Sequence, residues 1–191
     1  MKGARPLTDL EVKAVLKALV GPRDRALFVL GIRSGFRISE LLSLTLRDVA
    51  PLGPVLVAVA VKRRNMKGKE AGRTVPLHQE ARRHLRTWIG RLRGLGHTAP
   101  ETFVFRSRKG GNRAIDAIQA WRRLTAAYRT AGLAGRLGSH AMRKTFANRV
   151  YERLHHDLVK TQQAMGHKDV NSTVAYLSFK QEDIDAAILG D

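Results

Sequence analysis

Apolar positions recur every three or four residues along most of the chain, a pattern typical of amphipathic helices. Thr8 and Glu11 have the spacing of a capping box, and the apolar stripe behind them predicts a helix that runs to Val20. Pro22 suits a first helical position, and the apolar residues after it predict a second helix that stops at Gly35. Similar spacing predicts further helices over residues 38–44, 80–95, 114–131, 140–155, 157–165, 170–177 and 181–189.

Extended segments are few and lie mostly in the first half of the chain. Between Val55 and Val61, β-branched residues alternate with Leu and Ala, and residues 74–77 form a second extended piece. A polar segment, residues 62–73, joins them, which predicts a β-hairpin or a three-stranded meander. The predicted fold class is mainly α with a small antiparallel β-sheet (α+β). Because no repeat or low-complexity linker interrupts the chain, we expect a single domain over residues 1–191.

The charge balance favours an anionic partner. The 191 residues include 35 Lys and Arg against 16 Asp and Glu, a formal net charge of +19. Such a charge repels itself unless an anion neutralises it, and nucleic acid phosphates do so with release of counterions. A membrane surface would require a polybasic block beside an amphipathic anchor, which is not evident here. The basic clusters are Lys62-Arg63-Arg64, Arg82-Arg83, Arg106 to Lys109 and Arg122-Arg123.

Composition excludes several kinds of site. The chain has no cysteine, which excludes disulfides, thiolate metal sites and a cysteine nucleophile. Its longest apolar run is Val55 to Val61, too short to span a bilayer, and no apolar signal segment follows the N-terminus. We therefore predict a cytoplasmic protein that has no metal and no other cofactor.

Two motifs place an arginine near a helix start. In Gly35-Phe36-Arg37-Ile38-Ser39-Glu40, the glutamate lies one turn after Arg37 on the same face, where it can orient the guanidinium. In Ser139-His140-Ala141-Met142-Arg143, His140 and Arg143 share the first turn of a helix, where the helix dipole favours an anion. A phosphate there would accept a bidentate contact from the guanidinium and another from the imidazole.

Two further motifs carry a tyrosine and a lysine. Met165-Gly166-His167 is followed nine residues later by Tyr176, which places His167 in a turn and Tyr176 about two helical turns beyond it. Lys67 and Lys69 lie in the polar loop before Val75-Pro76-Leu77. Taken singly, each of the four motifs is also typical of ordinary surface structure.

Together and in this order, from residue 35 to residue 176, the motifs resemble the catalytic domain of the tyrosine recombinase (phage integrase) family. The resemblance implies that Arg37 and Arg143 clamp the non-bridging phosphate oxygens without a metal. It also implies that Tyr176 is the nucleophile of a 3′-phosphotyrosyl intermediate and that His140 helps to remove its proton.

The remaining roles follow from the same resemblance. His167 would donate a hydrogen bond to the phosphate, Glu40 would brace Arg37, and Lys67 would protonate the leaving 5′-oxygen. The loop is one residue longer than is usual in the family, so Lys69 remains an alternative to Lys67. The residues expected to contact DNA are Lys62, Arg63, Arg64, Arg73 and Lys144.

The resemblance implies a site-specific DNA recombinase or integrase that acts on double-stranded DNA. The alternatives are a type IB topoisomerase-like nicking–closing enzyme and a non-catalytic DNA-binding module of the same fold. We expect a tetramer on DNA and a monomer or weak oligomer without it, with residues 178–191 docking on a neighbouring protomer or folding back on their own domain. The family's N-terminal core-binding domain has no room before Leu7. The chain is then either an excised fragment or a minimal recombinase, in which a partner protein supplies the missing DNA clamp.

Overall fold

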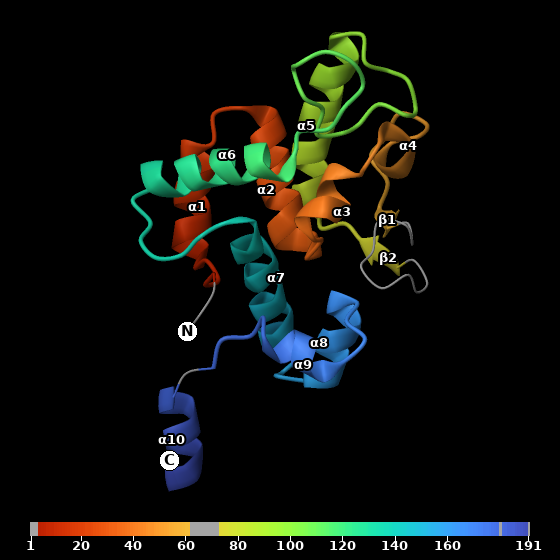
Figure 1. Cartoon of the computed structure of the whole chain (residues 1–191). Coiled ribbons are helices and arrows are strands. Elements are labelled where there is room, and N and C mark those ends of the chain that lie inside the picture. The colour runs from red at the N-terminus through yellow and green to blue at the C-terminus, as the bar shows by residue number, and fades with distance from the viewer. Residues whose placement is uncertain (1–3, 62–72, 180, 191) are drawn as a thin grey trace. The chain divides into compact units, whose positions relative to one another are not determined.

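The computed structural model describes residues 4–61, 73–179 and 181–190. It is mainly helical with a two-stranded antiparallel sheet, as predicted. The elements, shown in Figure 1, are α1 (Asp9–Ala18), α2 (Pro22–Ser34), α3 (Ile38–Leu42), α4 (Leu46–Val49), β1 (Ala58–Val61), β2 (Arg73–Pro76), α5 (Gln79–Gly94), α6 (Ala117–Thr130), α7 (Ser139–Arg153), α8 (Leu158–Met165), α9 (Val170–Val174) and α10 (Gln181–Leu189).

The chain forms two compact units, Met1–Phe146 and Ala147–Asp191, and the boundary between them falls inside α7. The expectation of one catalytic domain over residues 1–191 stays a prediction.

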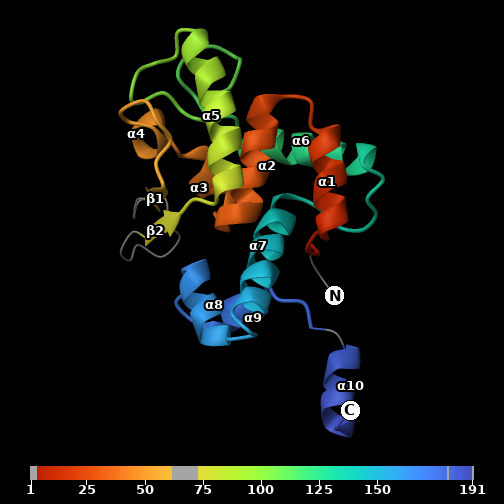
Figure 2. The ribbon, with the colours of Figure 1, turned by 180° about the vertical axis from the view of Figure 1, so that it is seen from behind.

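Helix α2 is the centre of the first unit. Every residue from 26 to 32 is buried, as is expected of a helical segment that is apolar all round. It packs against α5, while α6 crosses α2 and α1 (Figures 1 and 2). The helix ends at Gly35, which adopts the left-handed conformation with φ 63°. Gly35 and Phe36, which follow the central helix, are buried, and Arg37 comes directly after them.

The hairpin is confirmed for the described residues. β1 and β2 pair antiparallel, with Val59 opposite Val75 and Val61 opposite Arg73. Val59 and Val75 are both buried, so the side chains on one face of the hairpin join the core. The intervening residues 62–72 lie outside the described residues, and with them Lys62, Arg63, Arg64, Lys67 and Lys69.

The structure also differs locally from what the sequence pattern predicts. Thr45 pairs with Phe103, and Arg106 with Ala114, as isolated bridges outside the named strands. Helix α4 was not expected, because four residues are too few to display a helical period. Helix α9 ends at Val174 rather than at residue 177, and the amide of Tyr176 bonds instead to the Thr173 carbonyl at 2.9 Å, a tighter turn.

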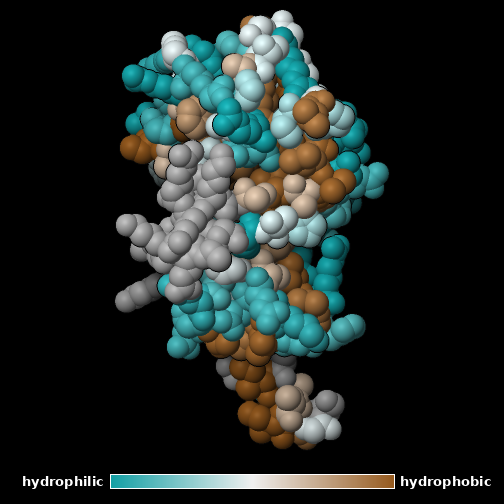
Figure 3. All heavy atoms as spheres, turned by 90° about the vertical axis from the view of Figure 1, so that its right-hand side faces the viewer, coloured by the Kyte–Doolittle hydropathy of each residue, from teal (hydrophilic) through white to brown (hydrophobic). Residues whose placement is uncertain are grey.

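In the second unit, helices α8 and α9 each begin at an aspartate cap. The Asp157 and Asp169 carboxylates accept hydrogen bonds from the amides of Lys160 and Ser172. Helix α10 exposes Ile184, Ile188 and Leu189, and Figure 3 shows hydrophobic residues over this C-terminal segment. Over the described residues, no helix combines the length and the apolar character needed to cross a membrane.

Candidate active site

Glu40 holds Arg37 at the start of α3. The Arg37 backbone N–H donates to Glu40 Oε2 at 2.7 Å, and Arg37 Nη1 donates to Oε1 at 2.9 Å. The Glu40 side chain is completely buried, whereas that of Arg37 retains 30% exposure. The ion pair expected from the three-residue spacing is therefore present, and it fixes one edge of a guanidinium that still reaches the surface.

Arg73 approaches the same carboxylate from β2. Its Nη2 lies 3.7 Å from Glu40 Oε2, and its guanidinium carbon lies 5.5 Å from the centre of the Phe36 ring. Burial lowers the pKa of Arg73; Glu40 opposes that shift, while Arg37 adds to it. The sequence predicted a DNA contact for this residue. That contact stays a prediction, and the long-range contacts with Glu40 and Phe36 are additional to it.

Arg143 is almost completely buried in α7, at 2% exposure, and its Nη1 donates a hydrogen bond to the carbonyl oxygen of Gly35. A side chain at Gly35 would collide with the ring of Phe146. The glycine therefore serves both the left-handed backbone and the close approach of α7. The result is that the two predicted arginine motifs meet at one turn, residues 35–37.

His140 lies in the first turn of α7 and is exposed, and Lys144 lies one turn further along and is half-buried. The start of this helix is tied to the N-terminal segment. The amide of Leu7 donates to Thr145 Oγ1 at 2.9 Å, and Arg5 Nη2 donates to the Ala134 carbonyl at 3.0 Å. The loop that leads to His140 is thus anchored by residues at the other end of the sequence.

In the second unit, His167 is held in a tight turn after α8. Gly166 is left-handed at φ 63°, and the amide of His167 donates to the Gln162 carbonyl at 3.1 Å, which closes the helix. His167 Nδ1 lies 2.8 Å from the hydroxyl of the fully buried Thr173, a hydrogen bond that sets the ring orientation. The rings of His167 and Tyr176 lie 5.4 Å apart between centroids.

Asn148 makes two hydrogen bonds to the backbone at and just after Tyr176. Its Nδ2 donates to the Tyr176 carbonyl at 3.0 Å, and its Oδ1 accepts from the amide of Ser178 at 3.0 Å. Sequence reasoning missed Asn148 and Thr173. In a single sequence, nothing distinguishes a positioning asparagine or threonine from any other polar helix residue. Tyr176 itself is half-buried.

The predicted catalytic residues thus fall into two groups, one in each compact unit. Arg37, His140 and Arg143 belong to the first unit, and His167 and Tyr176 belong to the second. Among the described residues, no three His, Cys, Asp or Glu side chains gather in a way that could hold a metal ion.

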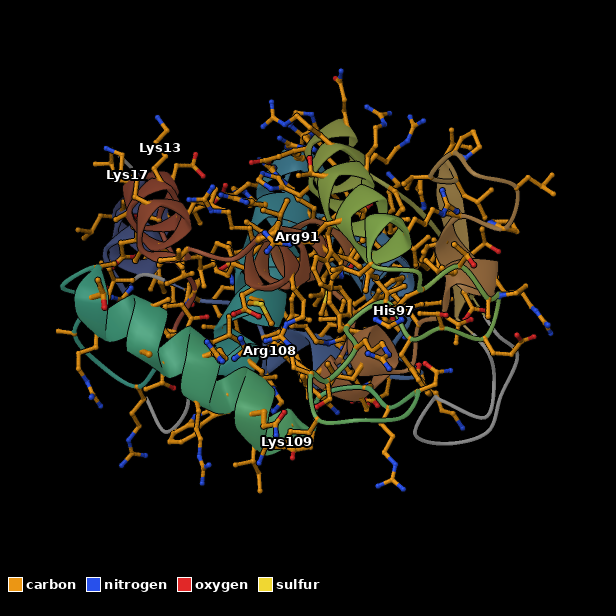
Figure 4. The ribbon with its side chains drawn as sticks, turned by 90° about the horizontal axis from the view of Figure 1, so that it is seen from above. Lys13, Lys17, Arg91, His97, Arg108 and Lys109 are labelled. Atoms are coloured by element: carbon orange, nitrogen blue, oxygen red, sulfur yellow. The ribbon has the colours of Figure 1, made fainter. Side chains whose placement is uncertain are left out.

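A second basic feature lies between α2 and α6. A pocket of about 200 Å³, here called the α2–α6 pocket, is lined by Arg23, Ser107, Arg108, Lys109, Ile115, Gln119, Arg122 and Arg123. Arg23 is oriented by Asp24 at 2.9 Å and by the Arg106 carbonyl at 3.2 Å. Figure 4 labels Arg108 and Lys109 in the loop beside α6. Two basic clusters that are separate in the sequence therefore surround one pocket.

Comparison with known proteins agrees with these motifs. A model of the phage integrase family matches residues 5–182. Tyrosine recombinase XerC of Chromobacterium violaceum is 34% identical over 156 residues, which are 81% of this chain and 47% of that protein. Tyrosine recombinase XerD of Pseudomonas putida is 30% identical over 184 residues, 90% of this chain and 56% of that protein. The chain therefore spans about half the length of these relatives.

Solved structures show the same fold. The XerA recombinase superposes with a TM-score of 0.78 at 21% identity, over 99% of this chain and 64% of that one. The XerH recombinase in a post-cleavage complex with a difH substrate gives 0.76 at 22% identity, over 96% of this chain and 51% of that one. The family match extends over nearly the whole chain, from before the Arg37 motif to beyond Tyr176, and the chain belongs to the phage integrase family.

Proposed function

We propose that this chain is the catalytic domain of a site-specific DNA recombinase, which cuts and rejoins strands through a 3′-phosphotyrosyl intermediate. The observation that carries the proposal is the convergence of Arg143 and the Arg37 turn, because phosphodiester exchange needs cationic donors where charge gathers on the phosphate. Relatives with this fold include recombinases and integrases solved in complex with DNA.

The chemistry of cleavage assigns a role to each residue. The Tyr176 oxygen attacks phosphorus, the bond from phosphorus to the 5′-oxygen breaks, and the phenolic proton passes toward His140. Either Lys67 or Lys69 gives a proton to the departing 5′-oxygen, which leaves as a hydroxyl. Rejoining is the reverse reaction, with a 5′-hydroxyl of the same or another strand as the nucleophile.

Two arginines of the first unit and a histidine of the second supply the charge stabilisation. Arg37 and Arg143 bind the non-bridging oxygens, and the planar guanidinium suits two parallel hydrogen bonds to phosphate. His167 donates a further hydrogen bond through Nε2, since Nδ1 is engaged with Thr173. The Arg37, Arg143 and His167 donors are therefore held by neighbouring groups before the substrate arrives, which is what transition-state stabilisation requires.

DNA binding extends beyond the reacting phosphate. The α2–α6 pocket presents five basic side chains, and Asp24, the carboxylate beside it, is already engaged with Arg23 and lies 4.0 Å from Arg123. A DNA backbone phosphate is the anion of matching charge and size. We expect the pocket to add contacts to affinity without taking part in bond cleavage.

The assembly on DNA belongs to the same proposal. Recombination joins two duplexes, so we expect four protomers on DNA and a monomer or weak oligomer without it. The apolar side chains of α10 would then dock on a neighbouring protomer. A separate DNA clamp, on the same polypeptide or on a partner protein, would hold the other face of the duplex.

A trapping experiment tests the function. The protein is mixed with sheared DNA from its host, denatured in SDS, and the covalently bound DNA is isolated and sequenced. We expect adducts at discrete sites with the natural chain and with Tyr151→Phe, and none with Tyr176→Phe. Equal adduct formation by Tyr176→Phe would contradict the nucleophile assignment. Scattered adducts together with relaxation of supercoiled plasmid would favour a nicking–closing enzyme.

A further inference from the structure

We propose that Arg73 is a positioning residue for the reaction: it holds Glu40 in place and, through Glu40, sets the orientation of Arg37 toward the phosphate. The inference rests on the proposed function, in which Arg37 contacts a non-bridging oxygen. In this role Arg73 acts through Glu40 and not by contact with the reacting phosphate. Its guanidinium lies nearest Glu40 Oε2, whereas the Arg37 guanidinium binds Oε1.

The buried carboxylate of Glu40 needs more than one positive partner. A carboxylate at 0% exposure is costly to bury unless cations and hydrogen-bond donors compensate it. Arg37 is only one such cation, and in the proposed function its guanidinium must also bind a phosphate oxygen. Arg73 Nη2, at 3.7 Å from Oε2, supplies a second positive charge beside the carboxylate.

Arg73 is itself held by its surroundings. Its side chain is 14% exposed and lies over the ring of Phe36, which is buried at 1% exposure. Arg73 is the first residue of β2, and its backbone pairs with that of Val61. A planar guanidinium fixed by a strand and an aromatic ring is well suited to fix a neighbouring carboxylate.

The two residues that Arg73 contacts flank Arg37 in the sequence. Phe36 directly precedes Arg37, and Glu40 follows it by one helical turn. Arg73 therefore contacts residues on both sides of Arg37, and these contacts join the hairpin to the start of α3. A shift of the carboxylate would move the Arg37 guanidinium with it, and displacements of about 1 Å can cost on the order of 100-fold in rate.

The test compares Arg73→Met and Arg73→Lys with Arg129→Met, a control for loss of an exposed arginine. The substrate is DNA at a site recovered by trapping. We expect Arg73→Met to slow single-turnover cleavage by about 10- to 100-fold at saturating DNA, with little change in DNA affinity. Arg73→Lys should be intermediate, because lysine retains the charge but not the planar donor. If Arg73→Met instead binds DNA much more weakly but cleaves at the normal rate at saturating DNA, Arg73 contacts DNA directly. That result would overturn the proposal.

Two modified substrates identify the group through which Arg73 acts. A methylphosphonate at the cleaved position is uncharged and depends less on Arg37, so it should bring Arg73→Met close to the natural chain. A bridging 5′-sulfur leaves without a proton, so it relieves loss of the general acid instead. If the sulfur substrate restores cleavage by Arg73→Met and the methylphosphonate does not, Arg73 acts through the general acid, Lys67 or Lys69. That result would contradict the proposal.

A measurement of stability, which does not depend on catalysis, separates this inference from the proposed function. The unfolding midpoints of Arg73→Met, Glu40→Gln and the double variant are compared, with Arg73→Lys as the milder change if Arg73→Met does not fold. Strong non-additivity is expected of groups that share one interaction. Additive shifts would overturn the link to Glu40 whether or not the chain cleaves DNA. Absence of any Tyr176-dependent adduct from the natural chain would count against the proposed function alone.

Discussion

Arg143 donates a hydrogen bond from Nη1 to the carbonyl oxygen of Gly35, a residue 108 positions earlier in the chain and two positions before Arg37. A donor that is almost fully buried is thereby aligned by the same turn that places the other predicted phosphate-binding arginine. The backbone carbonyl is a rigid partner, because it belongs to the C-cap of a helix buried in the core.

Gly35 should not tolerate a side chain. Gly35→Ala should destabilise the protein by about 2–4 kcal/mol, because alanine is strained at this positive φ and its methyl group collides with Phe146. The measurement is the free energy of unfolding in urea. Gly94→Ala is the matched control: it has open space in α5 and should be neutral or stabilising by up to about 1 kcal/mol. Equal effects of the two variants would contradict the packing argument.

Asn148 offers a test of positioning around the nucleophile. Asn148→Ala removes two hydrogen bonds to the backbone at Tyr176 and Ser178. We expect single-turnover cleavage to fall by about 10- to 100-fold while DNA affinity stays near that of the natural chain. Asn171→Ala, at an exposed position of α9, should leave cleavage unchanged. An Asn148→Ala variant that cleaves normally would show that the tyrosine backbone is held sufficiently by other contacts.

Thr173 should act through the His167 ring. Thr173→Val preserves the shape of the side chain but removes the hydroxyl that engages Nδ1 at 2.8 Å, whereas Thr173→Ser preserves the hydroxyl. Cleavage by the valine variant should drop by about tenfold or more, since the ring loses its fixed orientation, and serine should retain most activity. The two rates are measured on the same trapped site. Similar losses for both would point to packing rather than to the hydrogen bond.

The α2–α6 pocket should affect affinity and its dependence on salt. Arg122→Ala and Arg108→Ala each remove a basic side chain of the pocket. The control is Arg129→Ala, which removes an exposed arginine of α6 outside the pocket. Each lost phosphate contact should reduce the slope of log affinity against log salt by about 0.9. Fluorescence anisotropy at several salt concentrations measures the slope. Unchanged slopes would remove the pocket from the DNA interface.

A lower pH should weaken the ion pair between Arg5 and Glu11 in the N-terminal segment. A hydrogen bond from Arg5 holds the pKa of Glu11 below its usual range, and the Arg5–Glu11 pair has a distance of 2.5 Å. Since the folded pKa is depressed, this stabilisation is fully present above the unfolded pKa, about 4.3, and is lost as the pH falls through the folded value. The pair is partly exposed, so we expect about 0.5–1 kcal/mol. Thermal unfolding of Glu11→Gln between acidic and neutral pH should show a flatter profile than the natural chain.

Local signals in the sequence were sufficient for much of this protein. The helical periodicity predicted the helices of the core, because burial of one face or of the whole helix imposes a regular spacing of apolar residues. The Arg37–Glu40 pair was also predictable, since residues three apart are neighbours on any helix. The net charge and the order of the motifs indicated the family, and the family match confirmed it.

Only the tertiary structure decided which distant residues support these motifs. Arg73 reaches Glu40, Arg143 reaches Gly35, and the clusters around Arg108 and Arg122 gather at one pocket. Asn148 meets Tyr176 across 28 residues. None of these pairs has a fixed spacing, because each depends on how helices and strands pack after they form. Periodicity is a property of one element, whereas a buried carboxylate takes its partners from any segment that the core brings within reach.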